Sequence, residues 1–184
     1  MDPRSDLGKH PVSAVLAGPY GHPFHPILVT VPIGAWVAGL VFDVGSHVVD
    51  SPTFLAAGSI WLIGIGIAGA VAAALVGFLD LLAIPSGTVA FRTGLVHMGL
   101  NLGVTAAYAV GFVWRQHTGP AAGPVAIGPL LLSVAGLAIL GLSGSLGGRL
   151  AYRYGVRVVD EATQASGFAR PTEPSTAGRA RQVR

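Results

Sequence analysis

The stretch FLAAGSIWLIGIGIAGAVAAALVGFLDLLAI, residues 54–84, decides the fold class of this chain. It holds one charged residue, Asp80, in a run longer than the roughly 20 helical residues that cross a hydrocarbon layer of about 30 Å. A surface helix of a soluble protein would instead show a charged face along its whole length. The run therefore predicts a membrane-spanning helix.

The composition of the whole chain supports the same class. Of the 184 residues, 52% are hydrophobic and 10% are charged, with a mean hydropathy of +0.65. Soluble domains carry about 25% charged residues. The absence of cysteine excludes disulfides, thiolate metal sites and Cys-held iron–sulfur clusters. The net charge of +3 comes from basic residues in tails and loops, so we expect no nucleic-acid partner.

Three more apolar runs are long enough to span a bilayer, at about residues 27–49, 94–114 and 125–148. Pro52, Pro85 and the Pro120 to Pro124 stretch separate the runs, as helix breakers do. Short connections favour antiparallel neighbours. We therefore predict an all-α membrane protein with an antiparallel four-helix transmembrane bundle over 27–148. A segment over 1–26 precedes it, and a basic, largely flexible tail over 149–184 follows it.

The distribution of Lys and Arg predicts the orientation of this bundle. Only Arg115 falls on the side opposite the termini. The other ten lie on the side of both termini: Arg4, Lys9, Arg92, Arg149, Arg153, Arg157, Arg170, Arg179, Arg181 and Arg184. Because basic residues stay on the cytoplasmic side, both termini are expected in the cytoplasm. The Ala, Gly and Arg bias is typical of a GC-rich bacterial genome, so we expect a multi-pass protein of the bacterial cytoplasmic membrane.

This topology gathers polar residues of all four helices in the cytoplasmic leaflet. Ionisable residues at membrane depth are expensive, which makes them candidates for a functional site. The layer comprises His22, His25, Asp80, His97, Asn101, Ser143, Ser145, Arg149 and Tyr152.

Several of these residues also have a purely structural interpretation. Asp80 could pair with Arg92 or Arg149 at the headgroup level, and His97 with Asn101 could form an interhelical hydrogen-bond pair. Outside the layer, three residues near the opposite surface are interpreted as solvated: Asp43, His47 and His117.

Two prolines shape the first span. Pro26 suits the first helical position, which would place His25 at the N-cap. Pro32 should kink the helix, because it lacks the N–H that bonds one turn earlier.

Short motifs along the chain resemble those of the bacterial DUF2231 membrane-protein family. The motifs are HPFHP (22–26), PIG (32–34), FD (42–43), GFLD (77–80), LVH (95–97) with Asn101, LSGSLGG (142–148) and YRYGV (152–156). The resemblance covers about residues 21–157 and implies four spans in a family of uncharacterised function. Some relatives look fused to, or paired with, Rieske-type or cytochrome modules. This implies electron transfer and a partner that is a redox protein or a respiratory-type complex.

The first functional hypothesis is a b-type haem held in the bundle, with His25 and His97 as axial ligands. Cofactor contacts at the surface would come from Arg92, Arg149 and Tyr152. Small residues would make room for the ring, namely Gly94, Gly99 and Gly144.

Two alternatives remain open. His22, His25, His97 and Asp80 form a nitrogen and oxygen donor set suited to Zn, Fe or Cu. A non-catalytic membrane subunit or anchor of a redox complex, which could also be a homo-oligomer, fits a chain with little sequence outside the spans. We favour haem and an electron-transfer or accessory role over a stand-alone enzyme.

Overall fold

The computed structural model describes residues 6–18, 22–119 and 123–168. Arg4, Gly21, Pro120 and the arginines from Arg170 onward lie outside these ranges. Within them the chain contains helices and no strand, which confirms the predicted all-α class.

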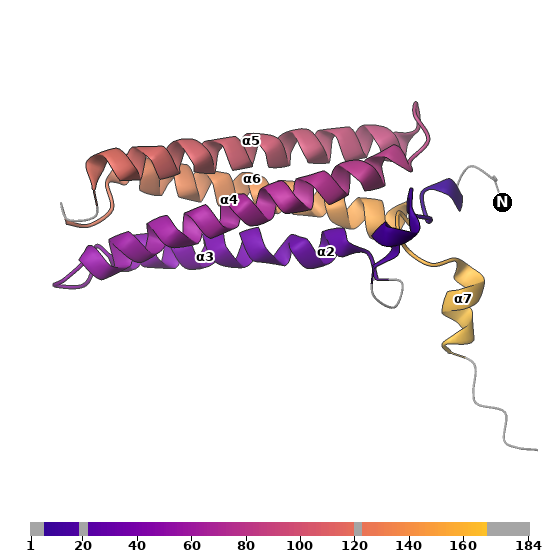
Figure 1. Cartoon of the computed structure of the whole chain (residues 1–184), viewed down its shortest axis with the longest axis horizontal. Helices are drawn as coiled ribbons and strands as arrows, with labels where there is room; N and C mark the ends of the chain where they lie inside the picture. Colours follow the sequence, from indigo (N-terminus) through magenta and orange to yellow (C-terminus); the bar gives the residue numbers. More distant parts are fainter. Residues whose placement is uncertain (1–5, 19–21, 120–122, 169–184) are drawn as a thin grey trace, which may run out of the picture.

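Four long helical segments lie side by side and alternate in direction (Figure 1). The first consists of α2 (Phe24–Leu28) and α3 (Thr30–Gly45), followed by α4 (Thr53–Leu82), α5 (Val89–Thr118) and α6 (Ile127–Gly148). A π-helical turn, η4 (Arg149–Arg153), extends α6. All four segments are long and apolar enough to cross a membrane, which is compatible with the predicted four-span helical bundle.

The helix ends differ from the expected bounds by several residues. The first span ends at Gly45 rather than near residue 49, and α5 runs from Val89 to Thr118 rather than over about 94–114. Arg92 and Arg115 lie inside α5, near its two ends. A prediction from hydropathy ends a helix at its first polar turn. The helix itself continues, because charged side chains near its ends do not interrupt the backbone hydrogen bonds.

The first span is interrupted at Val29, between α2 and α3. The interruption lies three residues before Pro32, which has no N–H to bond the carbonyl of Leu28. The expected N-cap at His25 is wrong, because Pro23 caps the helix and His25 is already helical. Pro26 allows this, since a proline in the first turn removes an N–H that has no partner within the helix.

The centre of the bundle is filled by a core cluster of four buried residues, Trp36, Ile63, Val104 and Tyr108. The rings of Trp36 and Tyr108 stack with centroids 4.0 Å apart and planes at 7°. Tyr108 lies against Gly136, where an added Cβ would come within 2.9 Å of the phenol ring. The absent side chain thus lets α5 and α6 approach closely.

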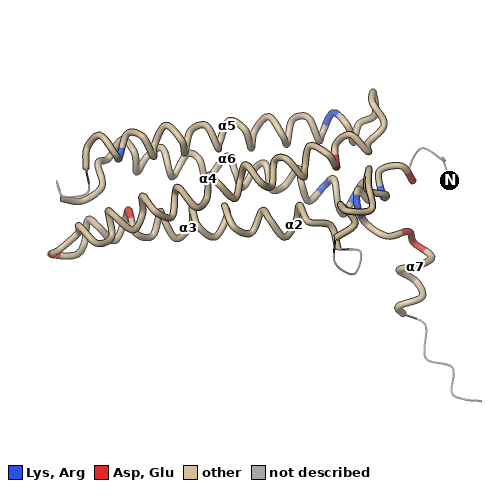
Figure 2. The backbone as a smooth tube through the Cα atoms, viewed as in Figure 1, with Lys and Arg blue, Asp and Glu red and all other residues tan. Residues whose placement is uncertain are grey.

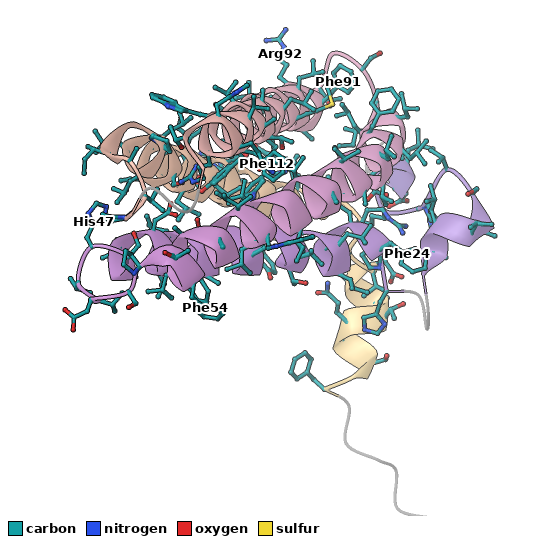
Figure 3. All side chains as sticks on the ribbon, turned by 60° about the vertical axis from the view of Figure 1, so that its left-hand side comes forward. Phe24, His47, Phe54, Phe91, Arg92 and Phe112 are labelled. Atoms are coloured by element: carbon teal, nitrogen blue, oxygen red, sulfur yellow. The ribbon has the colours of Figure 1, made fainter. Side chains whose placement is uncertain are left out.

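A buried ion pair between Asp43 and Arg115 lies at the end of the bundle opposite the termini. The guanidinium also donates to the carbonyl of Pro129 and the hydroxyl of Ser133 on α6. The interpretation of Asp43 as a solvated residue is therefore wrong. Asp43 lies near the end of α3, where a solvated side chain is expected, but its side chain points toward the other helices of the bundle. His47 and His117 are exposed as expected, and His47 points away from the bundle in Figure 3.

The opposite end carries the segments that precede and follow the spans. Most of the charged residues lie here, near η1 (Ala14–Ala17) and α7 (Glu161–Ser166) (Figure 2). The backbone N–H of Arg157 donates to the carbonyl of Gly8 at 2.9 Å. Within the segment that follows the spans, residues 149–153 thus continue α6 as η4, and Gly155 to Arg157 contact the N-terminal segment. We call this end of the bundle the termini end.

Candidate functional site

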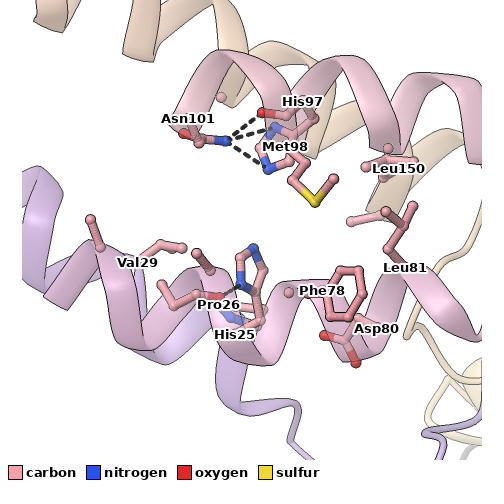
Figure 4. Close-up of a pocket in the computed structure, with 18 of the residues that line it drawn as sticks. His25, Pro26, Val29, Phe78, Asp80, Leu81, His97, Met98, Asn101 and Leu150 are labelled. Carbon is pink, nitrogen blue, oxygen red and sulfur yellow. Dashed lines mark hydrogen bonds between the residues drawn. The ribbon is translucent and has the colours of Figure 1, made fainter. Parts of the chain in front are cut away.

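A cavity of about 450 Å³ opens between the helices at the termini end (Figure 4). This volume lies within the range of about 300–1,000 Å³ that is usual for small-molecule and cofactor sites. Its walls are mainly apolar, with contributions from Val29, Ile33, Phe78, Leu81, Leu102, Leu140 and Leu150. The polar and titratable side chains in the lining are His25, Asp80, His97, Asn101, Thr105, Tyr152 and Arg157. A largely apolar cavity with a few convergent polar groups is the usual form of a ligand site.

His25 and His97 project toward one another across this cavity, from α2 and α5 (Figure 4). Their ring centroids are 6.4 Å apart and their planes are nearly perpendicular, at 82°. His25 opens the first span, yet it does not lie at the outermost rim of the bundle. It faces Ala73 of α4, and α4 continues for nine further residues to Leu82.

Both rings are fixed by a backbone carbonyl of a neighbouring helix. Nδ1 of His25 lies 2.9 Å from the carbonyl oxygen of Ala73, and Nδ1 of His97 lies 2.8 Å from that of Ser143. A carbonyl oxygen can only accept, so Nδ1 donates in each ring, and in the neutral form of the ring this leaves the lone pair on Nε2. Metal-ligating histidines are held in the same way through their second nitrogen.

Asn101 ties this arrangement to α6. Its amide nitrogen lies 2.8 Å from the carbonyl oxygen of His97 and 2.9 Å from the hydroxyl of Ser143. The contacts to the ring nitrogens of His97 are longer, at 3.2 and 3.4 Å. Because the amide has two hydrogens, the two shorter contacts account for both of them. The interhelical partner of His97 and Asn101 is therefore Ser143.

Glycines lie where the two imidazoles meet the neighbouring helices. A Cβ added at Gly77 would lie 2.8 Å from the His25 ring, and one at Gly147 would lie 3.1 Å from the His97 ring. Gly94 and Gly144 line the cavity, whereas Gly99 does not. The space that the absent side chain leaves at Gly94 is taken by Leu81, whereas at Gly144 it is open. The sequence reasoning missed the role of Gly77 and Gly147, which their positions opposite the histidines now explain.

Asp80 forms an ion pair with Arg157, with Oδ1 and Nε 3.0 Å apart. The expected partners were Arg92 or Arg149, and that expectation is wrong. Both of those arginines are exposed, neither lines the cavity, and Arg92 points away from the bundle in Figure 3. The structural reason is the return of the chain after η4, which carries Arg157 to the end of α4.

The remaining expected site residues lie at the margin. Tyr152 lines the cavity, but the residue is 92% exposed. His22 is exposed and does not line the cavity. In the described ranges, no three His, Asp or Glu side chains come close enough together to hold a metal ion.

Two cavity residues escaped the sequence reasoning. Met98 extends its thioether into the space beside His97 (Figure 4). Arg157 follows a chain reversal at Gly155, where φ is +66°. The signal for Arg157 was the glycine in Tyr154-Gly155-Val156, since a glycine after a helix commonly marks such a reversal.

The sequence of this chain matches a known protein family. The model of a family described as predicted membrane proteins, DUF2231, matches residues 21–160. The match includes all four spans, both histidines and Arg157. No curated protein and no solved structure matches the chain. The chain belongs to the DUF2231 family of membrane proteins.

Proposed function

We propose that this membrane protein binds one b-type haem between His25 and His97 and serves electron transfer. The observation that carries the proposal is the pair of opposed imidazoles with Nδ1 bonded to backbone. Two Nε2 atoms that share one metal at about 2.0 Å each would separate their ring centroids by about 6 Å. In the structure the ring centroids of His25 and His97 are 6.4 Å apart.

The surroundings of the histidines support a planar, mostly apolar ligand. Gly144 leaves room in the wall, because a Cβ there would meet nothing within 4 Å, and the stacked ring of Trp36 lines the cavity on the side of the core cluster. When bound, haem supplies one-electron redox chemistry. His25 and His97 would hold it, and the carbonyls of Ala73 and Ser143 would fix the orientation of each ring.

The donor set favours haem over a bare Zn, Fe or Cu ion. A structural metal ion takes four protein ligands, and a catalytic one usually takes three. The cavity offers two imidazoles, and the nearest carboxylate, Asp80, is engaged by Arg157. A porphyrin supplies the remaining ligands itself, so two imidazoles suffice.

The test is a reduced-minus-oxidised absorption spectrum of the protein purified in detergent from cells supplied with a haem precursor. We expect a Soret band and a sharp α-band, with about one haem per chain. His25→Ala and His97→Ala should each abolish these bands while circular dichroism and gel filtration stay unchanged. His117→Ala, at an exposed histidine of the other end, is the matched control.

A folded wild-type protein that takes up no haem, even on direct titration, would overturn the proposal. The polar layer would then be interpreted as a metal site if elemental analysis finds bound metal. Without metal, it would be the structural lock of an accessory membrane subunit.

A further inference from the structure

We infer that Arg157 receives the acidic end of the ligand in this cavity, which for haem means a propionate carboxylate. The inference rests on the proposed haem site. It assigns to Arg157 the cationic contact that the sequence analysis expected from Arg92 and Arg149. It identifies the class of ligand more narrowly, as a planar molecule with an anionic group on the side of the termini end.

The first observation is the position of Arg157. Among the residues that the structure describes, it is the one Lys or Arg in the lining of the cavity. Its partner Asp80 lies seven residues beyond Ala73, the residue that anchors His25, which is about 10 Å along α4. The contact with Asp80 thus places the guanidinium closer to the termini end than the carbonyl of Ala73 that bonds His25. Most of the charged residues gather at that end of the bundle (Figure 2).

The second observation is that Arg157 is held in place before any ligand arrives. Its backbone N–H is bonded to Gly8, and Nη2 donates to the carbonyl of Leu16 at 2.7 Å. Its φ is +59°, the one positive φ at a non-glycine residue in the described ranges. A positive φ at a residue other than glycine is strained, so it is kept only where the contacts around the residue enforce it. Such residues are enriched at ligand-binding sites.

The third observation is that the ion pair with Asp80 leaves bonding capacity unused. Nε of Arg157 and Oδ1 of Asp80 are both buried, and neither makes a hydrogen bond of good geometry despite the 3.0 Å contact. The side chains are 9% and 12% exposed. A guanidinium has five N–H donors and binds carboxylates best with two of them in parallel. A ligand carboxylate can therefore engage donors that Asp80 does not use.

The experiment compares haem b with its dimethyl ester, in which both propionates are neutral. Each is titrated into the full-length apoprotein in detergent, and binding is followed by the Soret band. For wild type we expect the acid to bind about 10-fold more tightly than the ester, the scale of one hydrogen-bonded charge contact. R157Q should abolish this preference, and R157K should retain part of it.

The controls separate a local contact from a general loosening of the fold. R153Q changes an exposed neighbouring arginine outside the cavity lining and should keep the wild-type preference. A loosened bundle would weaken acid and ester alike, so the ratio of their affinities would not change. D80N removes the competing carboxylate and should increase the preference for the acid.

Equal binding of acid and ester by wild type would overturn the inference while leaving the haem site intact. An undiminished preference in R157Q would do the same, and so would a reduced preference in D80N. If wild type binds neither compound, the proposed haem site fails, and this inference fails with it.

Discussion

Oδ2 of Asp43 lies 2.6 Å from Nη2 of Arg115, and the two side chains are 0% and 4% exposed. The pair joins α3 to α5, and Ser133 of α6 contacts both partners. Three helices are therefore fixed at the end of the bundle opposite the histidines.

The first prediction concerns this pair. Asp43→Ala leaves the Arg115 guanidinium buried without its counter-charge and should lower the free energy of unfolding by about 3–5 kcal/mol. Asp50→Ala, which removes an exposed carboxylate near the same end, should have little effect. Unfolding in mixed micelles measures both. The double variant Asp43→Leu with Arg115→Met should be more stable than either single variant, because no buried charge remains unpaired. A double variant less stable than both singles would contradict this account.

The second prediction concerns Gly77, which packs against the imidazole of His25. Gly77→Ala would place a Cβ 2.8 Å from the imidazole, so the ring must turn away from the carbonyl of Ala73. We expect the variant to fold and to lose most of its haem, as shown by the Soret absorbance per chain. Gly103→Ala is the matched control, because its Cβ would meet nothing within 4 Å. Equal haem content in both variants would show that the glycine is irrelevant to the site.

The third prediction concerns orientation in the membrane. The chain has no cysteine, so single cysteines can be introduced without background. Ser86 lies between α4 and α5 at the termini end, Gln116 lies near the far end of α5, and both are exposed. With cytoplasmic termini, an impermeant maleimide added to intact cells should label Gln116→Cys and spare Ser86→Cys. The reverse pattern would invert the topology.

The fourth prediction concerns pH and the short helix α7. Oδ1 of Asp160 accepts from the backbone N–H of Thr163 at 2.9 Å, and Oδ2 accepts from its hydroxyl at 2.8 Å. These bonds hold the pKa of Asp160 below its usual value. The cap therefore stabilises α7 fully above the ordinary aspartate pKa and is lost as the pH falls through the lowered value. A loss of amide-exchange protection of residues 161–166 in acid, relative to the intrinsic exchange rate at each pH, should be reproduced at neutral pH by Asp160→Ala. Unchanged amide exchange in Asp160→Ala would show that the Asp160 cap does not stabilise α7.

The sequence predicts the spans and both opposed histidines, because hydropathy and the alternation of helix direction determine depth in the membrane. It does not predict the direction of a side chain around its helix. Asp43 was therefore placed in solvent, although it faces α5 and α6. The pairing of Asp80 with Arg157 depends on the chain reversal at Gly155. The periodicity of apolar residues does not predict which distant residues such a reversal brings together.

The stack of Trp36 on Tyr108 has a consequence for the electrical behaviour of the molecule. It lies in the buried core cluster between the histidines and the Asp43–Arg115 pair. Aromatic carbon is a poor medium for ions and protons, so the cluster insulates one half of the bundle from the other. A proton or small ion that enters the histidine cavity would therefore leave again on the side of the membrane from which it came.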